Sequence, residues 1–254
     1  MSQFQGKAPS AFIRRSTFVA AFLLAATAAA PAQFAAQTFT VINGTAQTRT
    51  QEPVTFGFPV PKTPAVTSLT GFRIVNAAGQ AVPAQFRALT RWGGDRDVAT
   101  LPLRWVQASF KADAPANGAS TYTVSWSSAG PAGTLSVVQT SSTVTVTTGT
   151  NTSFVLSKTG FTLFNAATVN GTAILTGAGS LTMQAPGGAS IPATSVTTVV
   201  EQSGSVSAVV RQNGSLGELR YTCRWTFFAG RSDVVVDFRL ENPKCFGVAA
   251  SNVP

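Results

Sequence analysis

The stretch LRYTCRWTFFAGRSDVVVDFRLE, residues 219–241, contains two runs of strand-forming residues on either side of Gly230. From Val234 to Leu240, apolar side chains occupy every second position. Because successive side chains of a strand point to opposite faces, this pattern predicts a strand with one buried and one solvated face. Two such strands around a short turn predict an antiparallel hairpin.

The same alternation extends upstream through the second half of the chain, most regularly at Val144 to Thr147. Strands of this kind need a facing sheet to bury their apolar side, so residues 131–254 are predicted to form an antiparallel β-sandwich. The chain stops shortly after its last strong strand. We therefore expect a C-terminally truncated sandwich, whose last strand is left with an unpaired edge or exposed apolar surface.

Residues 33–130 form a block of short strands interrupted by prolines. The segment from Phe58 to Pro64 contains three prolines and is predicted to be an edge or a bend. Six short strands in under a hundred residues predict a small N-terminal β-barrel or a compact sandwich, and we expect the barrel. A Gly- and Ser-rich joint, Ser127 to Thr134, separates the two blocks. No amphipathic helix is expected, so the fold class is all-β.

Asn-Gly pairs lie at 43–44, 117–118, 170–171 and 213–214. This dipeptide suits the positive φ angles of a type I′ turn, so each pair is predicted to be a hairpin turn.

The first 32 residues resemble a signal peptide. A basic region with Lys7, Arg14 and Arg15 precedes the apolar stretch 18–30, and Ala30-Pro31-Ala32 offers a cleavage site. We expect cleavage near Ala32 and a secreted or periplasmic protein that has no membrane segment after cleavage. The paired arginines leave both general secretory and twin-arginine export open.

The charge balance argues against a nucleic-acid partner. The whole chain has 18 basic and nine acidic residues. Removing residues 1–32 leaves 15 basic residues and a net charge of +6. The excess is spread over many strands, which serves solubility or a mild attraction for an acidic glycan.

Cys223 and Cys245 are the only cysteines. An even number in an exported chain predicts a disulfide, and two free buried thiols are the alternative. With no histidine in the chain, a metal site, a Ser-His or Cys-His nucleophile and any cofactor are not expected.

No catalytic residue can be assigned. Asp95 and Asp97 are the closest carboxylate pair, but flanking arginines predict a salt-bridged loop and not a glycosidase pair. Tyr122 and Tyr221 lie within strand patterns beside apolar neighbours and are predicted to be core or sheet-surface aromatics and not lyase bases.

The four tryptophans, Trp92, Trp105, Trp126 and Trp225, could stack on sugar rings. Trp105 and Trp225 lie inside strands and are predicted to be core. Trp92, beside the turn at Gly93-Gly94, is the first candidate for a sugar contact. Together with Asp95, Arg96 and Asp97 it makes up our set of candidate glycan contacts.

Several motifs resemble the N-terminal region of exo-rhamnogalacturonan lyase-like secreted proteins. They are RTQEPVTFGFPVP at 49–61, GQAVPAQ at 79–85, LRWVQASF at 103–110 and TYTV at 121–124. The resemblance implies a RIFT-type barrel followed by part of a β-sandwich. In that family the catalytic residues lie in a later helical domain, so none is assigned here. The segment Trp92-Gly93-Gly94-Asp95-Arg96-Asp97 departs from the family's compact W-x-x-G-S pattern.

The resemblance implies a non-catalytic region of a secreted polysaccharide-degrading enzyme, with a structural or glycan-positioning role. Its partners would be an acidic or neutral polysaccharide and the missing C-terminal domains of the same polypeptide. The alternative is a non-enzymatic secreted β module that binds glycans or a cell surface.

Overall fold

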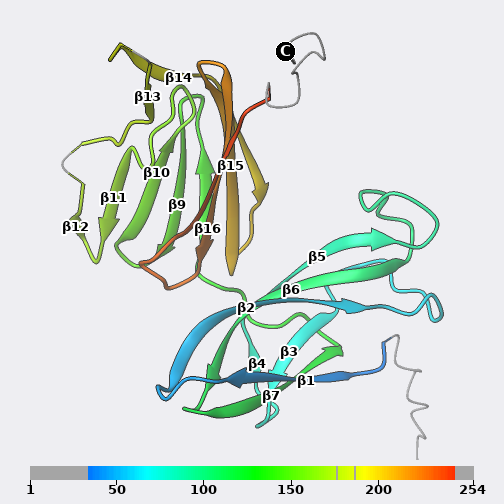
Figure 1. The fold of residues 1–254 in the computed structure, drawn as a ribbon. Coiled ribbons are helices and arrows are strands. Elements are labelled where there is room, and N and C mark those ends of the chain that lie inside the picture. Colours follow the sequence, from blue (N-terminus) through cyan, green and yellow to red (C-terminus); the bar gives the residue numbers. More distant parts are fainter. Residues whose placement is uncertain (1–33, 176, 186, 244–254) are drawn as a thin grey trace, which may run out of the picture. The chain divides into compact units, whose positions relative to one another are not determined.

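The computed structural model describes residues 34–175, 177–185 and 187–243, and every regular element in them is a β-strand (Figure 1). No helix in this part of the chain is long and apolar enough to cross a membrane. The chain folds into an N-terminal β-barrel and an antiparallel β-sandwich, which confirms the predicted fold class.

The barrel is built from two antiparallel sheets. One has the strand order β1-β7-β3-β4 and the other β2-β6-β5. The strands are β1 (Gln37–Asn43), β2 (Arg49–Pro59), β3 (Phe72–Asn76), β4 (Ala81–Val82), β5 (Ala84–Arg91), β6 (Leu103–Ala114) and β7 (Gly118–Trp126). As predicted, the proline-rich segment lies at an edge, because β2 is an outer strand that ends at Pro59.

Phenylalanine rings fill the barrel core. Phe72 meets Phe34 edge to face, with ring centroids 5.1 Å apart, and Phe58 at 5.3 Å. On β6, the even-numbered residues from Val106 to Ala114 are buried, so the odd-numbered ones face away from the core. This alternation determines which side chains of β6 lie on the outer surface of the barrel.

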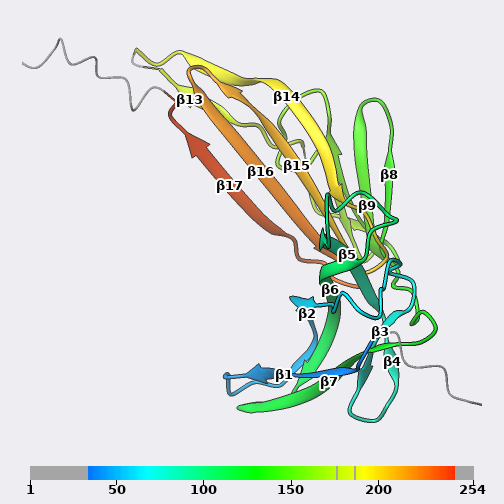
Figure 2. The same cartoon turned by 90° about the vertical axis from the view of Figure 1, so that its right-hand side faces the viewer.

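The sandwich packs two five-stranded sheets around a second core. The first has the order β12-β11-β10-β9-β8 and the second β13-β14-β15-β16-β17 (Figures 1 and 2). The strands are β8 (Ser136–Gln139), β9 (Thr143–Gly149), β10 (Thr152–Ser157), β11 (Ala166–Val169), β12 (Thr172–Ala173), β13 (Thr182–Gln184), β14 (Ser190–Gln202), β15 (Ser207–Leu216), β16 (Leu219–Phe228) and β17 (Val235–Glu241).

The quoted sequence forms the hairpin of β16 and β17, as predicted. Tyr221, Cys223, Trp225 and Phe227 alternate along β16 and are all buried in the sandwich core. Phe227 packs against Phe154 of the facing sheet, with ring centroids 5.6 Å apart. The period of two in the sequence therefore corresponds to the buried face of this sheet.

Only one Asn-Gly pair is a two-residue hairpin turn. Asn170 and Gly171 both have positive φ and join the paired strands β11 and β12. The turn at 117–118 leads from one sheet of the barrel to the other, and 43–44 follows β1, whose partner is β7. The pair 213–214 lies inside β15, so the hairpin prediction was wrong at these three positions.

Gly214 is needed inside its strand for packing. A Cβ on this residue would lie 2.7 Å from the hydroxyl oxygen of Tyr221 and 2.6 Å from the carbonyl oxygen of Thr194. The glycine thus makes room for a buried tyrosine on the neighbouring strand.

Burial raises the pKa of the Cys223 thiol to about 12, and the charge of Asp237 adds to the effect. Cys245 lies outside the described residues, as do residues 1–32, the predicted signal peptide. The disulfide, the signal peptide and the domain boundary at 130/131 stay predictions.

Candidate functional site

The outer face of the β2-β6-β5 sheet carries an exposed tryptophan. Trp105 lies one residue before the inward-facing Val106, and 42% of it is exposed. The prediction that Trp105 belongs to the core was wrong, because strand alternation turns it away from the phenylalanine-filled interior. Trp225, by contrast, is fully buried, as predicted.

The indole of Trp105 lies across Gly57 of the neighbouring strand. A Cβ on Gly57 would lie 3.0 Å from the indole nitrogen and 3.6 Å from Cε2. The missing side chain at position 57 therefore lets the ring approach the sheet closely. The indole of Trp105 is thus packed against the backbone of β2.

Polar groups lie beside this tryptophan on the same face. Gln107 is two residues further along β6, and it is in register with both Gly57 and Arg87. Residues in register point to the same side of a sheet, so Trp105, Gln107 and Arg87 share the outer face. We call these three residues, together with Arg96, the Trp105 surface.

Arg87 and Arg96 also line a hollow of about 470 Å³ whose other wall is formed by β14 and β15. Its remaining lining residues are Val199, Val200, Glu201 and Arg211. Gln85 of β5 accepts hydrogen bonds from the backbone nitrogens of Val206 (3.1 Å) and Ser207 (3.0 Å). These contacts bring β5 next to the start of β15.

The hollow has a positive charge because its single carboxylate is shared. Glu201 accepts bonds from Arg224 Nε at 2.9 Å and Nη2 at 3.3 Å, and lies 2.7 Å from Nε of Arg211. The hydrogen bond from Arg224 is the main cause that lowers the pKa of Glu201 below its usual range. Arg87 and Arg96 add two further guanidinium groups, of which only Arg96 has a nearby carboxylate, the exposed Asp97 at 3.5 Å, and this balance favours an anionic ligand.

We expect replacement of Glu201 by glutamine to lower the free energy of unfolding by about 1 kcal/mol at neutral pH. The folded-state pKa of Glu201 is depressed, so its contribution is full above the usual value of 4.5 and is lost as the pH falls through the folded-state pKa. The difference between wild type and variant should therefore shrink in acid. Urea unfolding at several pH values measures it.

Asp97→Asn is the matched control for this carboxylate. Asp97 lies 3.5 Å from Arg96 and its side chain is 82% exposed, so little change in stability is expected at any pH. A Glu201 variant as stable as wild type at pH 7 would contradict the prediction.

The four predicted glycan contacts do not converge on one place. Trp92 lines a separate apolar hollow of about 390 Å³ formed with Ala35, Gln37, Pro59, Val60 and Pro61. Its indole nitrogen donates to the carbonyl oxygen of Val60 at 3.1 Å, and the guanidinium of Arg104 lies 4.7 Å from its ring centroid. Trp92 is thus held on one edge and one face.

The other three residues form a surface turn. Asp95 accepts a hydrogen bond from the backbone nitrogen of Asp97, and Asp97 pairs with Arg96. This is the salt-bridged loop that the flanking arginines predicted. Only Arg96 of this turn reaches the positively charged hollow.

Arg91 is a key residue that sequence reasoning missed. It is 8% exposed, and its guanidinium donates to the carbonyl oxygens of Arg96 (2.8 Å), Leu101 (2.6 Å) and Thr67 (3.0 Å), with a longer contact to Ala99 at 3.4 Å. One cation therefore holds the loop that carries Trp92 and Arg96. Nothing in the sequence distinguishes Arg91 from the other arginines.

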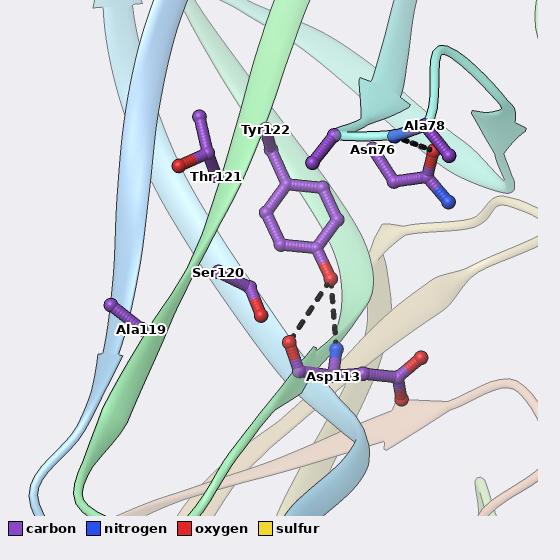
Figure 3. Close-up of a pocket in the computed structure, with 8 residues that line it drawn as sticks. Asn76, Ala78, Asp113, Ala119, Ser120, Thr121 and Tyr122 are labelled. Atoms are coloured by element: carbon purple, nitrogen blue, oxygen red, sulfur yellow. Dashed lines mark hydrogen bonds between the residues drawn. The ribbon is translucent and has the colours of Figure 1, made fainter.

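A further hollow, of about 440 Å³, lies beside Tyr122 on the barrel (Figure 3). The hydroxyl of Tyr122 accepts from the backbone nitrogen of Asp113 at 2.9 Å and donates to its carbonyl oxygen at 3.3 Å. Asn76 accepts bonds from two backbone nitrogens of its own turn, and Asp113 accepts one from Gln51. These polar groups hold the local structure.

Neither tyrosine is suited to act as a base. Tyr122 is 4% exposed and bonded to backbone, and Tyr221 is 1% exposed. Burial raises the pKa of Tyr221 to about 12, with a smaller effect of Cys223. Both are core aromatics, which agrees with the prediction.

Comparison with known proteins gives no family. No family model and no curated protein matches the chain. Two solved structures from Enterococcus faecalis are similar at low scores. One is an alpha-mannosidase from strain V583, with a TM-score of 0.44, 10% identity and 83% of this chain covered. The other is a protein in glycosyl hydrolase family 38, with a TM-score of 0.43, 11% identity and 82% covered. The chain spans 30% and 31% of their lengths.

Proposed function

We propose that this chain is a non-catalytic β region of a secreted polysaccharide-degrading enzyme, and that it positions an acidic glycan on the Trp105 surface. The observation that carries the proposal is the exposed indole of Trp105, fixed over Gly57 beside Gln107 and Arg87. The motif resemblance to exo-rhamnogalacturonan lyase-like proteins supports the link to polysaccharide.

A rigid exposed indole offers an apolar plane on which the C–H face of a sugar ring can pack. Because the ring already lies against the sheet, little side-chain entropy is lost on binding. The side-chain amide of Gln107 can donate to and accept from sugar hydroxyls. The indole of Trp105 and the amide of Gln107 would suffice to bind a neutral sugar.

The arginines favour an acidic sugar. Arg87 is in register with Gln107 on the outer face and also lines the hollow with Arg96 and Arg211. Guanidinium groups bind carboxylates with paired hydrogen bonds, and Glu201 is already occupied by Arg211 and Arg224. A uronate carboxylate can therefore bind here while its neighbouring residue stacks on Trp105.

We expect the Trp105→Ala variant to bind a rhamnogalacturonan fraction roughly tenfold or more weakly than wild type, which is typical for the loss of a central aromatic contact. Trp105→Phe, which keeps a ring, should retain part of the affinity. Titration calorimetry and affinity electrophoresis measure the change.

Two controls make this test specific. Ile42→Ala removes an apolar side chain of β1 that is more exposed than Trp105, at 77% against 42%, and should bind like wild type. The carboxyl-reduced polysaccharide should bind more weakly, and added salt should weaken binding of the acidic form. Unchanged binding by Trp105→Ala, or no binding by wild type, would refute the proposal.

A further inference from the structure

The last strand of the sandwich has one free edge. β17 is the final strand in the order β13-β14-β15-β16-β17, and within the described residues no strand pairs with its outer side (Figure 2). Such an edge presents a row of unpaired backbone donors and acceptors. The prediction of an unpaired edge is confirmed for this part of the chain.

The side chains of β17 remain exposed on both faces. Val236, Phe238 and Leu240 are in register with the buried Trp225, Cys223 and Tyr221, so they lie on the core side of the sheet. Nevertheless they are 37%, 45% and 50% exposed. The apolar face of the sandwich thus continues past its covered core as a stripe of three side chains.

The opposite face of β17 carries alternating charges. Asp237 is followed by Arg239 and Glu241 on this face. Asp237 is in register with Arg224 of β16, and Arg239 with the neutral Thr222. Arg239 therefore has no opposite charge in register on its own sheet.

We propose that two copies of this chain pair through β17 in antiparallel register centred on Phe238. Asp237 of each copy then lies opposite the partner's Arg239, and Val236 lies opposite the partner's Leu240. The two Phe238 rings meet at the twofold axis. The two sheets become one continuous sheet with both apolar stripes on the same side.

Charge selects this register over its neighbours. Antiparallel pairing that keeps the apolar side chains on one face can shift only in steps of two residues. One shift places Asp237 opposite the partner's Asp237. The other places Arg239 opposite the partner's Arg239 and Asp237 opposite the partner's Glu241. Both put like charges together, which is unfavourable across strands.

The pairing involves one seven-residue strand from each copy. Interfaces below roughly 1,200 Å² are typical of weak association, so the Kd should be in the micromolar range. The association does not depend on the Trp105 surface, and either proposal can fail without the other.

Sedimentation velocity of the purified protein at roughly 100 µM, above the expected Kd, tests this inference. Wild type should be dimeric. Arg239→Asp and Asp237→Lys should each be monomeric, because each places like charges opposite one another. Mixed together, the two variants should form a one-to-one dimer, because their charges are then complementary.

Lys62→Glu is the matched control, since it makes the same charge change as Arg239→Asp in an exposed loop. It should remain dimeric, and circular dichroism should show that all variants are folded. A monomeric wild type would overturn the inference, and this is the result expected if residues beyond 243 cover the outer edge of β17. So would a dimer that Arg239→Asp leaves intact. Because Arg239 is in register with Thr222, this variant should fold even if Asp237→Lys does not.

Discussion

Replacement of Arg91 by methionine is expected to lower the free energy of unfolding by about 3 kcal/mol. Methionine can fill the space of the aliphatic stem, but it cannot donate to the three closest carbonyl oxygens, of Thr67, Arg96 and Leu101. Since the guanidinium is buried, these carbonyls would lose a charged donor without gaining full access to water. Urea unfolding measures the change.

Arg87→Met is the control for this effect. Arg87 lies on the outer face and lines the open hollow, so its loss should weaken binding of an acidic glycan and leave stability nearly unchanged. Hydrogen exchange should also quicken in the loop of residues 92–101 in the Arg91 variant and not in the Arg87 variant. Equal stability of the two variants would show that Arg91 does not hold the loop.

Replacement of Gly133 by alanine is expected to cost about 2–3 kcal/mol, a typical penalty for overpacking. The new Cβ would overlap the carbonyl oxygen of Ser205, lie 2.7 Å from its carbonyl carbon and lie 3.0 Å from Cγ2 of Val206. The carbonyl oxygen of Ser205 accepts a hydrogen bond from the backbone nitrogen of Leu135, and its side-chain hydroxyl accepts one from the backbone nitrogen of Gly133, both at 2.9 Å. A backbone carbonyl held in this way cannot rotate out of the way of a methyl group.

Gly44→Ala is the matched control, because a Cβ there meets nothing within 4 Å and the residue does not require a positive φ. Its stability should stay within about 0.5 kcal/mol of wild type or rise slightly, through the lower entropy of the unfolded chain. Thermal unfolding of the two variants side by side measures the difference. Similar melting temperatures would mean that the segment at Gly133 can move away from Ser205.

Local pattern was enough for the strands but not for the turns. The alternation along β16 and β17 predicted their hairpin because side-chain direction in a strand is fixed by the backbone itself. The Asn-Gly signal succeeded at 170–171 and failed at 213–214. At Gly214 the space is required by Tyr221, a contact between strands that no local rule contains.

The candidate site shows the same division. Sequence composition pointed to tryptophan and arginine as glycan contacts, but it selected Trp92 and placed Trp105 in the core. Whether Trp105 is buried depends on which face of β6 points into the barrel. The sequence of one strand does not show this, because the inward face is set by pairing with the neighbouring strands. The hollow requires Arg87, Arg96, Glu201 and Arg211 to meet, although they are up to 124 positions apart in the sequence.

The sequence by itself determined the all-β class and most strand positions, because the period of two and the turn-forming residues act within a few positions of the chain. Only the tertiary structure decided that Trp105 is exposed over Gly57, that Arg91 binds carbonyl oxygens of two separate loops, and that Glu201 is shared by two arginines. These features depend on strand register and on contacts between distant segments. Many registers are compatible with the same alternation, and packing of the whole core selects one of them.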